Sequence, residues 1–470
     1  MLSLRDYQQT GVEQIRLAYK NGFRAPLYVL PTGGGKTVVF SYISTSTVQR
    51  GKNVLILVHR IELLKQTIQK LSGFGIQAGA ISPKFTPNFV AQVQVAMVQT
   101  MQNRTRFYPH FDLIIIDEAH HVAADTYMNI INAYPNAYQL GVTGTPIRSD
   151  GKGLGIDSGG IFDILISGPT VQELIDRDFL VEPVIYGSSN SIDFSGLKRG
   201  RHGDFTQKGM ESVMDKPYIV GNCVDHYRSI SNGDPGVAFC VSRKAAENVA
   251  AEFRSAGYKS KSVDGTTDYL DRIRILNGLA DGSIDVVTSC DVISEGTDIP
   301  AIAVAMLLRP TASLGLYIQQ VGRALRPSKG KDCAVILDHV GNVIRHGLPE
   351  EEREWSLDGK KPKTKTESIK DEDDVSVHQC ENCYRVFLAK LKECPGCGHE
   401  RKIKTRELEQ VEGTLEKMSK DEIKRLSLER RNQISSAKTA EDLQRIARER
   451  GYNPRWVKHI MNARRAKKSL

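Results

Sequence analysis

Short apolar runs alternate with longer stretches of helical periodicity over the first 340 or so residues of the chain. Runs that are apolar at consecutive positions are typical of strands buried on both faces of a parallel sheet. Their alternation with helices predicts a doubly wound α/β fold. The first set of predicted strands comprises Leu27–Leu30, Val54–Val58, Val93–Val98, Leu113–Ile116 and Tyr138–Thr143.

A second set of the same kind begins after a helix-like stretch from Thr170 to Leu180. We therefore expect two tandem α/β units, the first over residues 1–168 and the second over residues 169–345. Residues 186–215, rich in Gly, Ser, Lys and Arg, interrupt the second unit and predict an irregular excursion. The predicted strands of this unit are Val237–Cys240, Asp285–Ser289, Ile302–Leu308 and Ala334–Leu337.

The pattern changes beyond the second unit. Residues 346–376 are charged, first Lys- and Pro-rich and then acidic, which is typical of an exposed linker. Residues 377–402 contain four clustered cysteines, and residues 403–470 form a basic tail. Apolar residues at helical spacing predict two short helices in the tail, with Gly451 and Pro454 between them: Leu443, Ile446 and Ala447, then Trp456, Val457 and Ile460.

Composition is that of a globular protein, with 40% hydrophobic and 25% charged residues in 470 positions, enough for roughly three domains. The longest apolar run, Ala301–Leu308, is far shorter than the ~20 residues of a membrane-spanning helix. The N-terminus lacks the apolar core of a signal peptide. Four cysteines stand singly, as buried thiols do in a reducing compartment, so we expect a cytoplasmic protein: Cys223, Cys240, Cys290 and Cys333.

The formal net charge of +9 is unevenly distributed. Residues 401–470 hold 20 Lys and Arg against 10 Asp and Glu, whereas the preceding residues hold 44 against 45. The excess positive charge therefore lies in the tail and indicates an anionic partner. The tail is interpreted as a nucleic-acid clamp or, alternatively, as a solvated helical hairpin docked on the preceding units. In the clamp, the residues that neutralise phosphates are Arg455, Lys458, Arg464, Arg465, Lys467 and Lys468.

A glycine-rich segment lies between the first predicted strand and a helix-like stretch. Backbone amides in this context can cradle phosphates at a helix N-terminus. Lys36 is then placed to reach the β- and γ-phosphates of a nucleotide, and Thr37 to bind magnesium. Leu30 occupies the usual first glycine position, so the pattern is not strict, and a flexible turn is the alternative. The segment reads Pro31, Thr32, Gly33, Gly34, Gly35, Lys36 and Thr37.

Two acidic residues, Asp117 and Glu118, directly follow the apolar run that ends at Ile116. An acid at the end of such a strand can hold magnesium, while its neighbour orients or deprotonates the attacking water. We assign Asp117 to the metal and Glu118 to the general base; an exposed acidic turn is the alternative. His120 is included among the candidate catalytic residues, and His121 is expected to be a surface or packing residue.

Together, these two motifs resemble those of the DEAH-box branch of the superfamily 2 helicases. The resemblance spans residues 1 to about 340 and implies two RecA-like domains that use ATP and Mg²⁺. In the first unit it implies an adenine-recognition element, two elements that contact the nucleic-acid strand, and one that couples hydrolysis to movement. In that order these are Arg5, Tyr7 and Gln8; Arg60 with Glu62, Leu63 and Gln66; Gln99 with Thr100; and Thr143, Gly144 and Thr145.

In the second unit, two further motifs match the same family. One comprises Gly296 and Asp298, which are implied to meet the nucleotide, and Thr297, which is implied to meet nucleic acid. The other follows the pattern Q-x-x-G-R-x-x-R. Helix positions three and four apart share a face, so its polar side chains can project together at the ATP site. Its residues are Gln319, Gly322, Arg323 and Arg326, and the two arginines are candidate arginine fingers.

The four clustered cysteines form two C-x-x-C pairs separated by ten residues. Four thiolates at this spacing suit a closed tetrahedral zinc site, with a redox disulfide as the alternative. The intervening loop mixes aromatic and basic residues, which suits base stacking and phosphate contact, although a structural or protein-docking ribbon fits as well. The cysteines are Cys380, Cys383, Cys394 and Cys397, and the loop residues are Tyr384, Arg385, Phe387, Lys390 and Lys392.

These observations predict an ATP-dependent DNA helicase or translocase, similar to RadD-type helicases and phage-encoded relatives. The expected cofactors are ATP, Mg²⁺ and Zn²⁺. The expected partner is DNA with a single-stranded track, with protein partners possible at the zinc module or tail, in the cytoplasm of a bacterium or a phage-infected host. The alternatives are a non-unwinding translocase of the restriction-motor type, an RNA helicase, and a zinc-dependent adaptor with a degenerate motor. Intact Lys36, Glu118 and Arg326 argue against the adaptor.

Overall fold

The computed structural model divides the chain into two compact bodies. Residues 1–401 form one body, which contains both α/β units, and residues 402–470 form the other. Several predicted features lie outside the described residues: most of the 186–215 excursion, the motif of Gly296, Thr297 and Asp298, Lys390, and all six tail cations. The structure describes residues 3–108, 110–122, 125–148, 151–187, 200, 204–207, 209–210, 217–293, 302–359, 363–364, 377–380, 382–388, 391–400, 436–437, 439–449 and 461.

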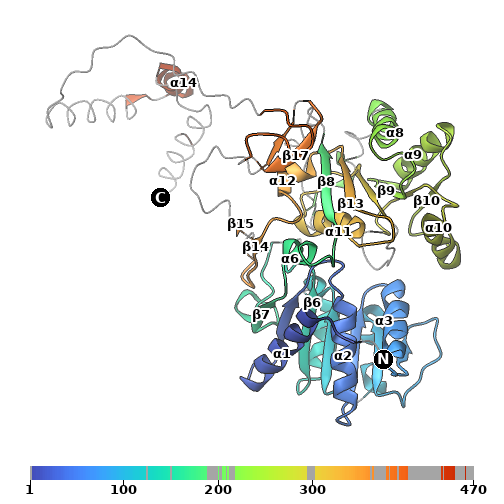
Figure 1. Cartoon of the computed structure of the whole chain (residues 1–470). Coiled ribbons are helices and arrows are strands. Elements are labelled where there is room, and N and C mark those ends of the chain that lie inside the picture. Colours follow the sequence, from blue (N-terminus) through green and yellow to red (C-terminus); the bar gives the residue numbers. More distant parts are fainter. Residues whose placement is uncertain are drawn as a thin grey trace. The chain divides into compact units, whose positions relative to one another are not determined.

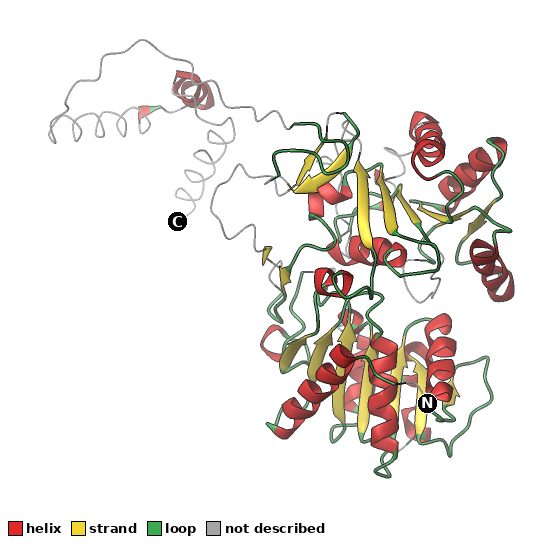
Figure 2. Ribbon diagram, in the orientation of Figure 1, coloured by secondary structure: helices red, strands yellow, loops and turns green. Residues whose placement is uncertain are grey.

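The first sheet has seven parallel strands in the order β3-β4-β2-β5-β6-β1-β7 (Figures 1 and 2). Its central strands are buried along their whole length, which is why their sequences are apolar at consecutive positions. The strands are β1 (Pro26–Val29), β2 (Val54–Val58), β3 (Gly79–Ile81), β4 (Val93–Met97), β5 (Leu113–Asp117), β6 (Tyr138–Thr143) and β7 (Ile164–Ser167).

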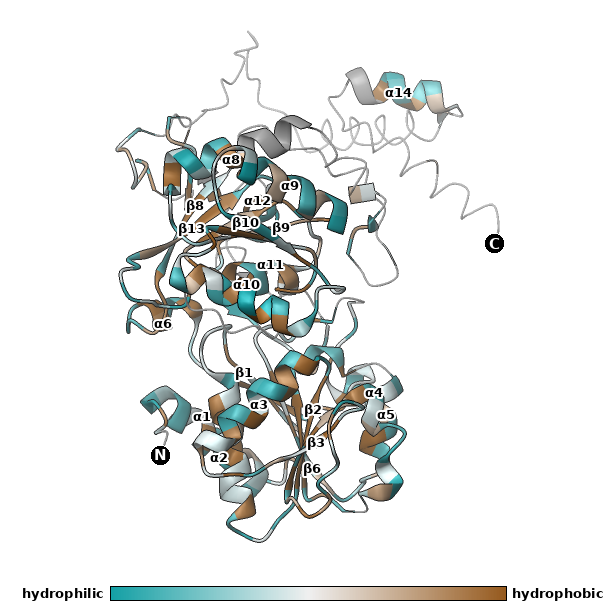
Figure 3. Ribbon diagram, turned by 90° about the vertical axis from the view of Figure 1, so that its right-hand side faces the viewer, coloured by the Kyte–Doolittle hydropathy of each residue, from teal (hydrophilic) through white to brown (hydrophobic). Residues whose placement is uncertain are grey.

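All five strands predicted in this unit are confirmed to within one or two residues. The two that were not predicted are β3, which has only three residues, and β7, whose four residues are only partly buried. Helices cover both faces of the sheet, and in Figure 3 their brown apolar sides face the strands. They are α1 (Asp6–Lys20), α2 (Lys36–Val48) and α3 (Ile61–Gly73) on one face, and α4 (Val98–Met101) and α5 (Asp125–Asn132) on the other.

The second sheet has eight strands in the order β10-β11-β9-β12-β13-β8-β17-β16, and its first six are parallel. The four predicted strands are confirmed as β9 (Gly236–Phe239), β11 (Val286–Ser289), β12 (Val304–Leu307) and β13 (Cys333–Asp338). The sequence missed β8 (Glu182–Gly187), which contains Pro183, and the partly polar β10 (Ser260–Val263). The helices are α6 (Val171–Ile175), α8 (Pro217–Ser231), α9 (Arg243–Ser255), α10 (Tyr269–Asp281), α11 (Leu314–Ala324) and α12 (Asn342–His346).

The cysteine-rich segment adds the last two strands to this sheet. β16 (Val377–Gln379) and β17 (Arg385–Leu388) form an antiparallel hairpin, and β17 also pairs antiparallel with β8. In that pairing Val386 lies opposite Ile185, and the Gly187 amide donates to the Tyr384 carbonyl at 3.2 Å. Val386 is buried in the same apolar core as the second sheet. The segment that composition set apart as a small module is therefore built onto the edge of the second unit.

Part of the segment that composition assigned to an exposed linker is also packed. The Leu357 carbonyl accepts hydrogen bonds from the amides of Leu154 and Gly155 of the first unit, at 2.8 and 3.0 Å. The buried Arg353 guanidinium donates to the carbonyls of Leu348 and His346, at 2.8 and 3.0 Å. These carbonyls satisfy the charged group locally, so its presence in the sequence does not indicate exposure. A short hairpin, β14 (Arg353–Glu354) with β15 (Lys363–Thr364), lies in the same segment.

In the tail, residues 402–470, the first predicted helix is confirmed as α14 (Ala440–Glu449), where Leu443 and Ile446 are buried. Thr439 caps it, because its hydroxyl accepts from the Asp442 amide at 3.1 Å while the Asp442 carboxylate accepts from the Thr439 amide at 3.2 Å. The second predicted helix lies outside the described residues. Among the helices of the described part of the chain, none is both long and apolar enough to cross a membrane.

Candidate nucleotide and nucleic-acid site

The candidate residues of the first unit gather at one edge of its sheet. Because all seven strands are parallel, their carboxyl ends meet at a single edge, where ligands of doubly wound folds bind. The phosphate loop follows β1 at this edge, the acidic pair closes β5, and Thr143 ends β6. Arg60 follows β2, and Gln99 with Thr100 lie in α4, directly after β4. The order of the β-strands therefore places the nucleotide motifs beside the motifs that are predicted to contact nucleic acid.

The phosphate loop depends on glycine at two positions. Gly33 and Gly35 adopt positive φ angles of 89° and 88°, which side-chain-bearing residues rarely adopt. A Cβ atom on Gly35 would also approach the Gln8 side-chain amide to 2.4 Å. Leu30, at the position where the usual pattern has glycine, is fully buried in the apolar core. Its side chain packs against the loop at Gly34, where an added Cβ atom would lie 2.9 Å from Leu30 Cγ, so the larger residue at the first position is accommodated beneath the turn into α2.

Glu118 sits at a strained turn between β5 and a short 3-10 turn, Ala119–His121. Its φ and ψ are 47° and 55°, a left-handed conformation that costs a non-glycine residue roughly 1–2 kcal/mol. This conformation brings Glu118 Oε1 to 3.7 Å from Lys36 Nζ and Oε2 to 3.5 Å from His120 Nδ1. His120 Nδ1 also lies 3.1 Å from Thr143 Oγ1. The turn thus brings the phosphate loop, the acidic pair and the coupling motif into contact.

The predicted adenine element packs on the phosphate loop and on one residue that no motif indicated. The Gly34 carbonyl accepts hydrogen bonds from the Tyr7 hydroxyl at 2.9 Å and the Gln8 amide at 3.1 Å. Phe179, between α6 and β8, lies 4.4 Å from the Arg5 guanidinium and 5.1 Å from the Tyr7 ring. A single aromatic residue after a helix carries no sequence signal, so only the structure brings Phe179 to this site.

Helix α11 of the second unit packs directly on the phosphate loop. A Cβ atom on Gly322 would lie 2.7 Å from Thr32 Cβ, so this glycine permits the close approach. Arg323, in the last turn of α11, and Arg326, which follows the end of α11 at Ala324, line one cavity together with Lys36. The prediction that both arginines project from one helix is therefore wrong for Arg326. Gln319 is buried within α11 and is not among the described residues that line the cavity. The two arginines therefore lie in the cavity wall, whereas Gln319 does not.

Lys331 stabilises the end of α11. Its ammonium group donates to the carbonyls of Ile302 at 2.6 Å and Arg326 at 2.7 Å, and also to that of Ala324. Burial lowers the pKa of Lys331 to about 8, because the charged form loses hydration there. The backbone beside the two arginines is therefore held by a residue outside every recognised motif.

A cavity of about 670 Å³ is lined by residues of both α/β units. Its volume falls within the ~300–1,000 Å³ typical of small-molecule sites. Cationic groups predominate and two carboxylates lie among them, a donor set that suits a polyphosphate with a divalent cation. Gln66, which the motif resemblance implied to contact nucleic acid, also lies in this wall. The charged lining residues are Arg5, Lys36, Lys70, Arg323, Arg326, Asp117 and Glu118.

Residues of the motif at Arg60–Gln66, which is predicted to contact nucleic acid, also contact the second α/β unit. The Arg60 guanidinium donates to the Asp291 carbonyl at 3.1 Å. Glu62 forms an ion pair with Arg272 of α10, and both side chains are nearly buried. One helical turn on from Glu62, Lys65 lies over the Tyr269 ring, 3.3 Å from its centre. Helix α3 therefore contacts α10 through an ion pair and a cation–π contact.

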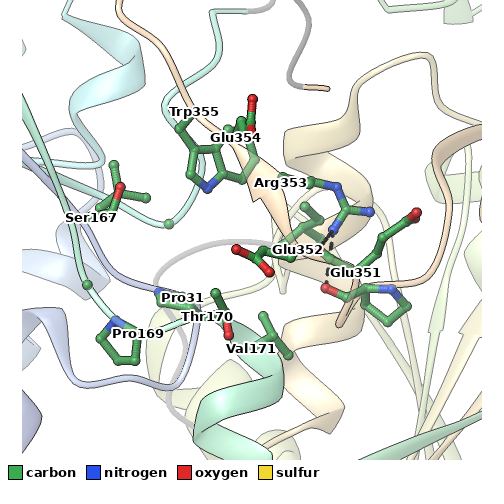
Figure 4. A pocket seen from close by; sticks show the side chains of 15 residues that line it. Pro31, Ser167, Pro169, Thr170, Val171, Glu351, Glu352, Arg353, Glu354 and Trp355 are labelled. Carbon is green, nitrogen blue, oxygen red and sulfur yellow. Dashed lines mark hydrogen bonds between the residues drawn. The ribbon is translucent and has the colours of Figure 1, made fainter. Parts of the chain in front are cut away.

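A second cavity, of about 310 Å³, lies where the chain passes from β7 to α6 (Figure 4). Residues 167–171 form one side of it, and residues 349–355, including Trp355, form the other. Pro31 of the phosphate loop and Gly144 of the coupling motif also line it. The joint between the two α/β units therefore lies next to the phosphate loop.

Four cysteines converge, two at the turn of the β16–β17 hairpin and two beyond β17, with all four Sγ atoms within 4.8 Å of one another. The Cys380–Cys397 and Cys383–Cys394 sulfur pairs are 3.6 and 3.5 Å apart, far longer than the ~2.05 Å of a disulfide bond. A tetrahedron with Zn–S bonds of ~2.3 Å has sulfur separations of about 3.8 Å. The donor set and its geometry therefore fit a structural zinc site.

The loop between the cysteine pairs fits the stacking interpretation only in part. Phe387 is buried beside Cys380 and Cys394, so its ring is not available to a base. Tyr384 is half exposed. The buried aromatic ring instead forms the small apolar core of the hairpin.

Comparison with protein families finds two matches. Residues 1–148 match the model described as type III restriction enzyme, res subunit, and residues 218–328 match the helicase conserved C-terminal domain.

Individual proteins are also similar. A 51.5 kDa protein of a Lactococcus phage (isolate 7-9) is 34% identical over 84% of this chain and 82% of its own length. IRC3 of Saccharomyces cerevisiae, named as an ATP-dependent helicase, is 29% identical over 72% of this chain, which spans about half (51%) of the yeast protein. Among solved structures, a fragment of an HsdR subunit of a type I restriction enzyme from Vibrio vulnificus YJ016 has a TM-score of 0.58 at 21% identity, covering 76% of this chain and 67% of that one.

Proposed function

Because the chain belongs to superfamily 2 of the helicases and is an ATP-dependent helicase or translocase, we propose that it moves along a single strand of DNA and separates the duplex. One observation carries the proposal: Lys36, Asp117 and Glu118 of the first unit line one cavity together with Arg323 and Arg326 of the second. A site divided in this way makes hydrolysis depend on contact between the units, which converts turnover into movement.

Within this site, we assign each group by its chemistry. Lys36 and the loop Thr32–Gly35 hold the phosphates of ATP, and Thr37 with Asp117 binds Mg²⁺, which neutralises charge on the phosphates. Glu118 accepts the proton of the attacking water, while His120 links it to Thr143. Arg323 and Arg326 stabilise the charge that develops on the transferred phosphoryl group. Arg5 and Gln8 recognise adenine, and the Phe179 ring lies beside Arg5.

For the nucleic-acid track, we assign Arg60, Gln99 and Thr100 of the first unit, with Thr297 of the second. DNA is favoured over RNA because the family model that matches residues 1–148 describes a restriction subunit, and restriction enzymes act on DNA. The sequence Asp117-Glu118-Ala119-His120 supports the DEAH-box branch, and the four-cysteine hairpin after the motor supports a RadD-like organisation. The cytoplasmic location and the protein partners of the hairpin and tail stay predictions.

The test of the function is steady-state ATP hydrolysis with no nucleic acid, single-stranded DNA, duplex DNA or single-stranded RNA. Lys36→Ala provides the blank, because it removes the ammonium group beside Glu118. We expect strong stimulation by single-stranded DNA and unwinding in a strand-displacement assay with the same protein. Stimulation by RNA alone would identify an RNA helicase, and stimulation without unwinding would identify a translocase. No stimulation by any of the three would contradict the proposal.

We also propose that Cys380, Cys383, Cys394 and Cys397 bind one Zn²⁺ ion and that this ion stabilises the second unit. Because β17 pairs with β8, loss of the metal exposes an edge strand of the sheet in addition to unfolding the hairpin. Cys383→Ser or chelation should remove one zinc per chain, measured by elemental analysis, and lower the melting temperature by about 5 °C or more. Cys333→Ser, at a thiol outside the cluster, is the control. A metal-free chain with an unchanged melting temperature would exclude a stabilising zinc site.

A further inference from the structure

Three histidine rings form a tilted stack along the edge of the first sheet that holds the nucleotide site, with interplanar angles of 57° between His59 and His121 and 42° between His120 and His121. His59 directly follows β2, and His120 and His121 form the turn after Glu118 at the end of β5. The His121 ring lies 4.1 Å from the His120 ring and 4.7 Å from the His59 ring, between ring centres. The sequence predicts His121 to be a surface or packing residue. The structure places it between two other imidazoles, in contact with both.

One end of this histidine stack is at the catalytic groups. His120 Nδ1 lies 3.5 Å from Glu118 Oε2 and 3.1 Å from Thr143 Oγ1. Thr143 in turn donates to the Thr145 carbonyl at 3.1 Å and accepts from the Thr145 amide at 3.2 Å. A displacement of the His120 ring therefore changes the surroundings of the proposed general base and of the coupling motif together.

The other end is at the proposed nucleic-acid track. His59 is adjacent in sequence to Arg60, whose guanidinium reaches the Asp291 carbonyl of the second unit. β2 lies between β5 and β4 in the sheet, and Gln99 and Thr100 follow β4. The histidine stack thus connects residues that are assigned to nucleic-acid binding with residues that are assigned to ATP. Its members are rigid planar rings.

We propose that His121 is a positioning residue that couples engagement of the nucleic-acid strand at Arg60 to the placement of His120 and Glu118. The inference rests on the proposed function, because it requires hydrolysis to be stimulated by nucleic acid. Packed side chains with defined arrangements are the usual carriers of such coupling. A strand that pulls on Arg60 shifts His59, and ring contact passes this shift through His121 to His120.

The test compares His121→Ala with His121→Phe, because phenylalanine keeps a planar ring that can stack while alanine removes it. We expect His121→Ala to lower the ratio of DNA-stimulated to basal ATP hydrolysis by about tenfold, a typical size for coupling between two sites. Its affinity for single-stranded DNA, measured by fluorescence anisotropy, should stay close to wild type. His121→Phe should restore most of the ratio. His110→Ala, at an exposed histidine beside Asp112 in the same unit, is the matched control and should leave the ratio unchanged.

The possible outcomes separate the two proposals. If the wild-type protein is stimulated and His121→Ala is stimulated equally, the coupling inference fails and the proposed function stands. If phenylalanine is no better than alanine, ring stacking does not carry the coupling. If the wild-type protein is not stimulated by any nucleic acid, the proposed function itself fails. Because His121 is exposed, both variants should fold, and thermal melting checks this directly.

Discussion

Glu118→Gln should lower ATP hydrolysis by about 10²- to 10⁴-fold, the usual contribution of a positioned general base. The amide of glutamine matches the carboxylate in shape but does not take a proton from water. Glu118 is nearly buried, between the ammonium of Lys36 and the ring of His120, so no other described carboxylate except its neighbour Asp117 lines the cavity to replace it. The measurement is the rate of phosphate release under single-turnover conditions.

Nucleotide binding separates a chemical defect from a structural one. Glu118→Gln should still bind ATP and Mg²⁺, because Lys36, Thr37 and Asp117 are unchanged. Glu13→Gln, at an exposed carboxylate on α1 that bonds to Gln9, is the matched control and should hydrolyse ATP at the wild-type rate. A Glu118→Gln variant that keeps more than a small part of its activity would show that another group acts as the base.

Arg326→Ala should lower the hydrolysis rate by about 10³-fold, as expected for removal of an arginine finger. Arg326 and Arg323 line the same cavity as Lys36 but come from the second α/β unit, from the last turn of α11 and the segment that follows it. Their charge reaches the nucleotide only when the two units are in contact, so the loss should appear in kcat for ATP. Arg323→Ala tested in parallel shows how the effect divides between the two residues.

Two further variants sharpen this test. Arg326→Lys keeps the charge but loses the planar guanidinium, and we expect it to recover little activity. Arg254→Ala, at an exposed arginine on α9 that pairs with Glu247, controls for the loss of one positive charge from the second unit. If both Arg326→Ala and Arg323→Ala hydrolyse ATP normally, hydrolysis does not depend on the second unit and the split-site mechanism is wrong.

Much of the candidate site follows from local sequence, for reasons that the structure makes clear. A phosphate loop needs glycines where φ is positive, and Gly33 and Gly35 occupy those positions. Asp117 and Glu118 lie at the end of a strand whose apolar run is visible in the sequence. The roles of these residues are predictions until the variants are measured, but their convergence in one cavity is observed.

Other parts of the site had no local signal. Phe179 joins Arg5 and Tyr7, and Lys331 supports the end of α11, through contacts between residues far apart in the chain. Gln66 belongs to a motif that the family resemblance associates with nucleic-acid contact. The direction of α3, however, places its side chain in the wall of the nucleotide cavity. A motif specifies which residues occur together, whereas the helix to which they belong decides which way each one faces.

By itself, the sequence determined the two α/β units, their main strands, the chemistry of the phosphate loop and acidic pair, and the spacing of the four cysteines. These features depend on patterns within a few residues: consecutive apolar positions, glycines at a turn and paired thiols. Only the tertiary structure decided that β17 extends the second sheet at β8, that Leu357 bonds to the first unit, and that the His121 ring contacts those of His59 and His120. These contacts join segments separated by tens to hundreds of positions, and their free energy comes from hydrogen bonds and ring packing that exist only once both segments have folded.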